Sequence, residues 1–262
     1  AADIVLKDQL NVEIFRYEFA ALLDLTILAS ADADELTIDF SQGPVLPADG
    51  VVFVGVVDAG DSLNLVGTSA GSITTYLNSP GTGAVSIDGR SASFENVLDV
   101  TDRLVAQQRT MQFGMEDDQA TIDNGLEAGF LTVTSGTDVV AAVTSTVPTS
   151  ALAVNAGAGN DVISVGDVSS EIASRMIVDG QAGDDDLSAV SARHAVSMTG
   201  GDGGDTIWGG QGNDTLDGAG GDDWIFARAG DDLVTGGDGV DRMSGNNGHD
   251  TLSGGAGRDS LY

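Results

Sequence analysis

Seven consecutive nine-residue repeats make up residues 200–262. In order they read GGDGGDTIW, GGQGNDTLD, GAGGDDWIF, ARAGDDLVT, GGDGVDRMS, GNNGHDTLS and GGAGRDSLY. Position four is always Gly, position six is always Asp, and position eight is always apolar. A strict short period of this kind predicts a solenoid, in which each repeat forms the same unit and stacked units bury a continuous core.

The content of the repeat assigns a role to each position. Positions one to six are expected to form a tight turn, because Gly tolerates the positive φ angles that such a turn requires. Positions seven to nine are expected to form a short strand whose central side chain points inward, since side chains alternate along a strand. The inward residues are Ile207, Leu216, Ile225, Val234, Met243, Leu252 and Leu261. Two repeats, or eighteen residues, then make one coil.

The phased aspartates predict a metal site. Ca²⁺ binds six to eight oxygen ligands, which carboxylates and backbone carbonyls supply. Two units upstream, AGAGNDVIS (156–164) and GQAGDDDLS (180–188), fit the same pattern. The candidate ligands are therefore Asp161, Asp185, Asp205, Asp214, Asp223, Asp232, Asp241, Asp250 and Asp259.

The spacing sorts these aspartates into two columns. Same-side residues of the regular repeats are eighteen apart, and the two upstream steps are 24 and 20 residues. One column is expected to hold Asp161, Asp185, Asp205, Asp223, Asp241 and Asp259, and the other Asp214, Asp232 and Asp250. We expect Ca²⁺ between stacked neighbours, for example Asp205 with Asp223, and longer crossings on the opposite side of the upstream coils.

The repeats resemble the repeats-in-toxin (RTX) family, whose consensus nonapeptide is G-G-x-G-x-D-x-U-x. The resemblance covers residues 200–262 and departs from the consensus in the first two glycines, at Ala219, Ala227, Arg228 and Asn246. It implies an all-β fold, a right-handed parallel β-roll in which each Ca²⁺ lies between the turns of successive coils.

Charge and composition exclude several functions. The chain has 41 acidic and 10 basic residues, a net charge of −31, which repels nucleic acid and anionic membranes. The repeats alone contain 12 Asp and 3 Arg, a net of −9 that bound Ca²⁺ would offset. There is no cysteine for disulfides, zinc-thiolate sites or thiol catalysis, and no apolar run approaches the ~20 residues that span a membrane. Aromatic residues make up 5% of the chain, which argues against a carbohydrate-binding groove.

Residues 25–155 are expected to form a degenerate parallel β-helix that leads into the calcium β-roll of residues 156–262. Short segments rich in Val, Ile, Leu and Thr occur at 23–30, 35–41, 51–57, 62–67, 84–89 and 130–135, bounded by Gly, Asp, Asn or Ser. Asp118 and Asp138 precede Asp161 at similar spacing, which favours one continuous parallel β-solenoid. A separate β-sandwich is the alternative. Residues 1–24 are an edge or cap, in which 8–24 forms either a short helix or two strands.

Candidate catalytic residues are few, and we expect no enzyme. The G-x-S-x-G sequence at 67–71 requires a strand-to-helix turn to act as a nucleophile elbow, and SITTYLNS after it is typical of a strand. His249 fills a variable turn position and is expected to face solvent, and His194 has no evident partner. Arg90, Arg103 and Arg109 are expected to pair with acids on the surface.

These observations favour a secreted, calcium-dependent β-solenoid with a structural or adhesive role at the cell surface. Weak calcium sites fill where ambient Ca²⁺ is high, which favours an extracellular location. Because the chain stops at the end of a repeat, head-to-tail assembly into fibres is a further expectation. The sequence does not identify the surface or polysaccharide that the protein would bind. Two alternatives remain: the calcium-binding tail of a secreted hydrolase, lyase or toxin, and a polysaccharide-modifying β-helix enzyme.

Overall fold

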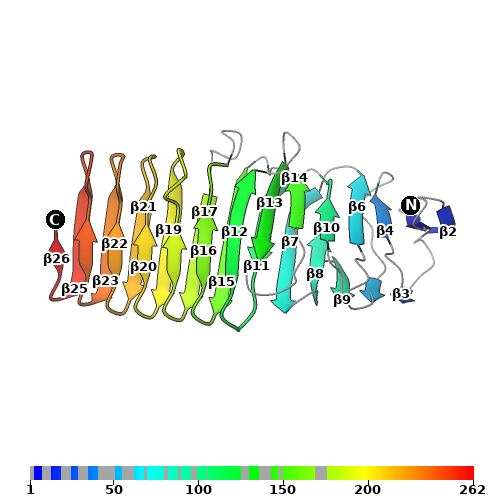
Figure 1. Cartoon of the computed structure of the whole chain (residues 1–262), viewed down its shortest axis with the longest axis horizontal. Helices are drawn as coiled ribbons and strands as arrows, with labels where there is room; N and C mark the ends of the chain where they lie inside the picture. The colour runs from blue at the N-terminus through cyan, green and yellow to red at the C-terminus, as the bar shows by residue number, and fades with distance from the viewer. Residues whose placement is uncertain are drawn as a thin grey trace. The chain divides into compact units, whose positions relative to one another are not determined.

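The computed structural model describes residues 3–7, 13–18, 25–28, 35–40, 51–54, 62–67, 70–79, 82–87, 90–95, 99–104, 106–124, 130–135, 143–146, 148, 150–168 and 176–262. These residues are strands joined by turns and loops (Figure 1). Nowhere among them is there a helix able to cross a bilayer. They form two compact units, one of residues 1–110 and 125–149 and the other of residues 111–124 and 150–262. The second unit thus starts at Ser150, a few residues before the expected boundary, and also takes in 111–124.

The second unit is a stack of parallel coils, and each coil gives one strand to each of two sheets (Figure 1). The first sheet runs β12 (Gln119–Asn124), β16 (Val162–Val165), β18 (Asp186–Ser188), β20 (Thr206–Trp208), β22 (Trp224–Phe226), β24 (Arg242–Ser244) and β26 (Ser260–Leu261). The second runs β15 (Ala151–Ala158), β17 (Met176–Ala182), β19 (Val196–Asp202), β21 (Thr215–Gly220), β23 (Leu233–Gly239) and β25 (Thr251–Gly257). Every successive pair is parallel, as predicted for a solenoid.

The core of the roll lies between these sheets and consists of the position-eight side chains. Ile207 pairs with Ile225, and Ile225 with Met243, so identical positions of successive coils stack directly. Ile207, Leu216, Ile225, Val234 and Met243 are at most 1% exposed, which confirms the inward prediction. Leu252 is half-buried, and Leu261 in the last coil is 46% exposed.

The two sides of the coil differ, which the repeat pattern does not reveal. On the first sheet the strands cover only positions seven to nine, and positions one to six form the turn. On the second sheet the strand continues into the next repeat, to position three in β21 and to position four in β23. The prediction of a six-residue turn is therefore wrong on this side, because the chain stays extended long enough to add backbone hydrogen bonds between coils.

Position two takes a left-handed conformation even where it is not Gly. Gln181, Ala219, Arg228 and Asn246 have φ between 63° and 78°. This region costs a residue with a Cβ about 1–2 kcal/mol, less for Asn. In four repeats the residue at position two therefore has a strained backbone conformation.

The first unit is also built from two sheets, but hairpins interrupt its coils. One sheet runs β2 (Glu13–Glu18), β1 (Asp3–Lys7), β4 (Glu35–Phe40), β6 (Ser62–Gly67), β10 (Asp99–Asp102), β14 (Val143–Thr146) and β13 (Phe130–Ser135). The other runs β7 (Ala70–Ser79), β8 (Thr82–Ile87), β9 (Arg90–Glu95), β5 (Val51–Val54) and β3 (Leu25–Leu28). β11 (Ala106–Gln112) crosses the boundary between the units along the sequence.

Pairing in the first unit is mostly parallel between coils and antiparallel within hairpins. The pairs β3–β5, β5–β9, β4–β6, β6–β10 and β10–β14 are parallel. The pairs β1–β2, β1–β4, β7–β8, β8–β9 and β13–β14 are antiparallel. All six predicted strand segments contain a strand, and the strand alternative holds for residues 13–18, while the rest of 8–24 and Asp138 lie outside the described residues.

Replacing the position-four glycine Gly221 is expected to disrupt the roll. Its φ is 125°, and a Cβ there would lie far inside the contact distance of the Gly203 carbonyl of the preceding coil. Gly221→Ala should lower stability by about 2 kcal/mol or more. The neighbouring Gly220→Ala is the control, because the nearest atoms to its Cβ are 3.7 and 3.8 Å away. Equal denaturation midpoints for the two variants in Ca²⁺ would contradict this packing.

Candidate metal centre

The first column of aspartates is linked by backbone hydrogen bonds. Each aspartate donates its backbone N–H to Oδ1 of the aspartate in the next coil. The pairs are Asp161 to Asp185 at 2.8 Å, Asp185 to Asp205 at 2.9 Å, Asp205 to Asp223 at 2.8 Å, Asp223 to Asp241 at 3.0 Å and Asp241 to Asp259 at 3.2 Å. The stacking predicted from the 24-, 20- and 18-residue steps is therefore present.

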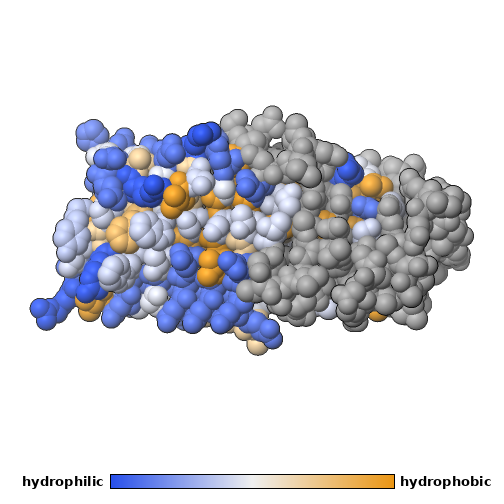
Figure 2. All heavy atoms as spheres, viewed as in Figure 1, coloured by the Kyte–Doolittle hydropathy of each residue, from blue (hydrophilic) through white to orange (hydrophobic). Residues whose placement is uncertain are grey.

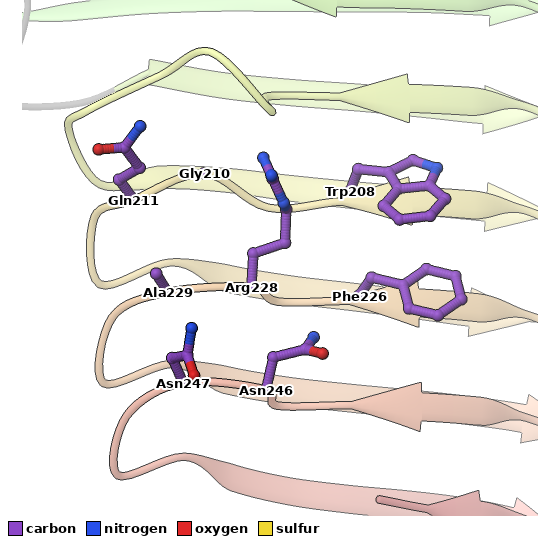
Figure 3. A pocket seen from close by; sticks show the side chains of 8 residues that line it. All are labelled: Trp208, Gly210, Gln211, Phe226, Arg228, Ala229, Asn246 and Asn247. Carbon is purple, nitrogen blue, oxygen red and sulfur yellow. The ribbon is translucent and has the colours of Figure 1, made fainter.

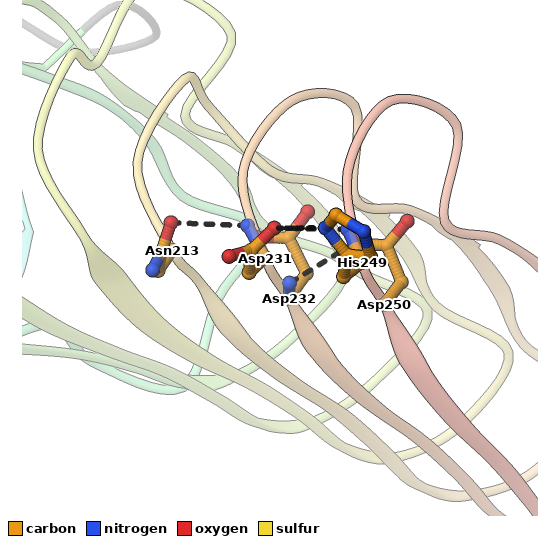
Figure 4. A network of polar contacts seen from close by, with 5 residues as sticks. All are labelled: Asn213, Asp231, Asp232, His249 and Asp250. Atoms are coloured by element: carbon orange, nitrogen blue, oxygen red, sulfur yellow. Dashed lines mark hydrogen bonds and ion pairs between the residues drawn. The ribbon is translucent and has the colours of Figure 1, made fainter.

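The second column has the same arrangement on the other side of the coil. The Asp214 N–H donates to Asp232 Oδ1 at 2.7 Å, and the Asp232 N–H donates to Asp250 Oδ1 at 3.0 Å (Figure 4). Asp214 is the first aspartate of this column, and its Oδ1 accepts the Val196 N–H at 2.9 Å. The regular repeats thus place one aspartate on each side of every coil.

Most of these carboxylates bury their second oxygen without a hydrogen bond. The Oδ2 atoms concerned belong to Asp161, Asp185, Asp205, Asp223, Asp232 and Asp241. All six residues are at most 2% exposed. A buried charge is costly unless it is paired with another charge or binds a metal, so these oxygens call for a cation.

A small cradle lies beside the Oδ2 atoms of Asp185, Asp223 and Asp241, and it exists because position one of their repeats is Gly. A Cβ on Gly218 would overlap Asp223 Oδ2 and lie 2.5 Å from the Gly236 carbonyl oxygen of the next coil. Gly180 and Gly236 have the same surroundings, made by Asp185 with the Gly200 carbonyl and by Asp241 with the Gly254 carbonyl. A carboxylate oxygen and a backbone carbonyl oxygen therefore converge at these three glycines.

This donor set fits Ca²⁺. Among the described residues no three carboxylate or imidazole side chains meet at one point, so an ion here takes much of its coordination from backbone carbonyls. Hard oxygen ligands from carboxylates and the backbone are what Ca²⁺ prefers. Asp185, Asp223 and Asp241 would hold it together with the position-one carbonyls, and its charge would neutralise the buried Oδ2 atoms.

Three members of the columns differ from the rest. Asp214 Oδ2 accepts a hydrogen bond from the Gly210 N–H at 2.7 Å, so this oxygen already has a partner. In the repeats of Asp161 and Asp232, position one is Ala156 and Ala227, so a methyl group stands where the other repeats have Gly. The sites at Asp161, Asp214 and Asp232 are therefore distinct from those at Asp185, Asp223 and Asp241.

The structure also adds a residue to the first column. The Asp118 N–H donates to Asp161 Oδ1 at 2.7 Å, so Asp118 lies one coil before Asp161 although 43 residues separate them. The sequence shows the 43-residue spacing between Asp118 and Asp161. Only the structure shows that residues 125–149, which lie between them in the sequence, belong to the first unit.

A second ladder, which the sequence analysis missed, runs along position five. The Asp117, Asn160 and Asp184 side chains accept the backbone N–H of the next coil, from Asn160, Asp184 and Gly204 at 2.8, 2.9 and 2.8 Å. Asn213, Asp222 and Asp231 do the same for Asp231, Val240 and His249 at 3.0, 2.8 and 2.9 Å (Figure 4). Because position-six side chains reach toward the preceding coil, the two ladders run in opposite directions.

The structure describes part of the candidate catalytic residues. Gly67 ends β6, and β7 begins at Ala70, so a strand follows the G-x-S-x-G sequence as predicted. The His249 side chain is 98% exposed, as expected, and lies 3.5 Å from Asp231 Oδ1. Arg109 corrects the surface expectation, because it is 1% exposed and donates to the Leu104 carbonyl. Arg103 is exposed, and the side chain of Arg90 lies outside the described residues.

Comparison with known protein families agrees with this geometry. Residues 199–234 and 235–262 match the RTX calcium-binding nonapeptide repeat, in four copies. The searches of curated proteins and of solved structures found no match. The C-terminal part of the chain therefore carries calcium-binding RTX repeats, and the remainder of the chain is described by its fold alone.

Asp223→Asn should separate the hydrogen-bonding role of the column from metal binding. The amide oxygen can still accept the Asp205 N–H, but the buried negative charge is lost. We expect the calcium concentration for half-maximal folding to rise roughly tenfold or more. Asp259→Asn is the same-column control and should change less, because Asp259 is more exposed than Asp223. Equal midpoints in matched calcium titrations would contradict the assignment.

The metal-free roll should be more stable in mild acid than at neutral pH. Burial raises the pKa of Asp205 to about 7 and those of Asp185, Asp214 and Asp223 to about 6, against 3.8 ordinarily, and backbone hydrogen bonds offset this in part. Since these folded-state values exceed the unfolded ones, this contribution is fully present below pH ~4 and is lost as pH rises through about 6 to 7. The β-structure of the full chain in metal-free buffer, measured by circular dichroism, should therefore decrease from pH 5 to pH 8. A flat or rising profile would show that the carboxylates are not buried as described.

Proposed function

We propose that this chain is a secreted, calcium-stabilised β-solenoid that acts as a structural and adhesive part of the cell surface, and not as an enzyme. The observation that carries the proposal is the row of buried Oδ2 atoms beside position-one carbonyls, repeated from coil to coil. An array of this kind makes folding depend on the ion, since metal-binding free energy becomes folding free energy. It uses calcium for architecture and leaves the outer faces of the coils free for contacts.

An extracellular location follows from the chemistry of such sites. The roll contains many carboxylates stacked in register, and in low calcium their repulsion and burial oppose folding. High ambient calcium outside the cell would fill the sites and allow the roll to form. The chain would then remain unfolded in its C-terminal part until it meets that calcium.

An adhesive role is supported by the outer surface of the first sheet. Trp224 is 48% exposed, and the Arg242 guanidinium lies 5.1 Å from its ring centre. Figure 2 shows hydrophilic residues along both long edges of the visible face of the roll, with weakly polar and apolar residues between them. Exposed aromatic and apolar residues on such an acidic protein mark a contact surface. End-to-end assembly into fibres is part of the same proposal, because the parallel pairing between coils can continue from one chain to another.

Calcium-dependent folding of the full chain tests the proposal. Circular dichroism should show a gain of β-structure when millimolar Ca²⁺ is added to the metal-free chain. Gly218→Ala should weaken this response, because its Cβ fills the cradle at Asp223, whereas Gly220→Ala should not. Neither glycine has a positive φ, so backbone strain does not separate the two variants. A full β-spectrum in excess chelator would refute calcium stabilisation, and light scattering of the same samples tests assembly.

A further inference from the structure

A hollow of about 270 Å³ lies on the outer surface of the roll, where three successive coils turn away from the first sheet (Figure 3). The stacked rings of Trp208 and Phe226 form one end of it. Gln211 and Asn247 lie at the other end, and Arg228 and Asn246 lie between. The hollow thus combines an aromatic wall with three amide side chains and one guanidinium.

The two half-buried rings stack on each other, and their outer neighbours in the ladder are small. Their centres are 4.3 Å apart and their planes differ by 16°. Along the same ladder, Trp208 pairs with Ser188 on one side and Phe226 with Ser244 on the other. Because serine is small, no bulky ladder neighbour covers the outer face of either ring. A flat apolar face of a ligand can therefore stack against the pair.

The polar lining is held in place at a cost to the backbone. Arg228 and Asn246 occupy position two of successive repeats on the same side, where the repeat family has Gly. Their φ angles are 78° and 63°, a region that a side chain disfavours. Gln181 and Ala219 share this conformation, so the strain belongs to the turn, but at Arg228 and Asn246 the turn brings two polar side chains to one hollow.

The positions of these side chains are fixed by further hydrogen bonds. Arg228 Nη1 donates to the Val190 carbonyl at 2.9 Å, and Asn246 Nδ2 donates to the Ser244 carbonyl at 3.2 Å. The Asn247 N–H donates to the Arg228 carbonyl at 2.8 Å, which ties the two coils together under the hollow. The amide oxygens and the other guanidinium N–H groups remain available to a ligand by their chemistry.

We propose that this hollow binds a neutral saccharide, with one pyranose ring stacked on the Trp208–Phe226 pair and its hydroxyls bonded to the amides and to Arg228. A pyranose has an apolar C–H face for the rings, and hydroxyls that both donate and accept, as amide side chains do. The size of the hollow suits one ring of a longer chain. The inference rests on the proposed function, because it supplies the adhesive surface with a ligand class and requires the folded roll.

Other ligand classes fit less well. The net charge of −31 repels nucleic acids and polyanionic glycans, and a single arginine already bonded to Val190 does not offset it. A peptide that adds a strand needs an open sheet edge, whereas the hollow lies over turns of consecutive paired coils. The low aromatic content of the chain argued against a sugar site, but the fold brings both tryptophans and Phe226 to adjacent strands β20 and β22.

Tryptophan fluorescence tests the proposal directly. Trp224 lies outside the hollow, so Trp224→Phe leaves Trp208 as the only tryptophan of the full chain. Titration of this calcium-loaded variant with dextran, mannan and galactan should change the Trp208 emission for at least one of these neutral polymers. Polygalacturonate is the acidic comparison, and affinity electrophoresis of the unaltered chain in the same polymers provides a second measurement.

Three substitutions then locate the site. Trp208→Ala should weaken binding by about tenfold, whereas Tyr76→Ala, at an exposed aromatic residue of the first unit, should leave it unchanged in electrophoresis. Arg228→Gly should also weaken binding several-fold, yet its calcium midpoint for folding should be no higher than that of the unaltered chain, since the strained residue is gone. A residue with a purely structural role would not show this opposite effect on binding and folding.

The outcomes separate this inference from the proposed function. A chain that folds in Ca²⁺ by circular dichroism but binds none of the neutral polymers overturns the saccharide site alone, as does binding of polygalacturonate only. Binding that is insensitive to Trp208→Ala and Arg228→Gly also overturns it. A chain whose spectrum does not respond to Ca²⁺ overturns the proposed function instead.

Discussion

The burial of one aspartate in each half-coil is the constraint on which the roll depends. One carboxylate oxygen accepts the backbone N–H of the preceding coil and so holds the coils in register, while the other faces a backbone carbonyl at a position-one glycine. The first interaction needs no metal, and the second is unfavourable without one. The same aspartate side chain thus holds the coils in register and makes the folding of the roll depend on the ion.

This division explains why the repeat tolerates change at some positions and not at others. Position four carries no side chain at any repeat, because the carbonyl of the neighbouring coil occupies that space. Position two carries Ala, Arg, Asn or Gln in four repeats, in a left-handed backbone. A Cβ at the position-two glycines Gly201 and Gly237 would overlap a backbone carbonyl of the preceding coil, so this position is close to the stack as well. At Arg228 and Asn246 the variation changes which side chains line the hollow on the outer surface.

Much of the roll could be predicted from the sequence, because its period is regular. Residues eighteen apart share an environment, so the inward residues, the two aspartate columns and the parallel pairing follow from spacing alone. The direction of the hydrogen bonds, the position-five ladder and the place of Asp118 do not, since they depend on which atom of a side chain faces which coil. The hairpins of the first unit were also missed, because short strands of similar composition do not reveal whether the chain returns parallel or antiparallel. Arg109 shows the same limit: its burial is a property of the folded neighbourhood and not of its sequence position.

The nonapeptide shared by the two half-coils has a consequence for how such a protein changes in length. Loss or gain of a single nonapeptide would keep the phase of the Asp and apolar positions, although the turns on the two sides differ. It would, however, move every later repeat to the opposite sheet, so that rings such as Trp208 and Phe226, which meet because they are eighteen residues apart, would face different sides. Changes by whole coils preserve both the stack and its surface. Such a chain can thus lengthen by eighteen residues without a change in its surface pattern. A change of nine residues instead alters which side chains lie together on each outer face.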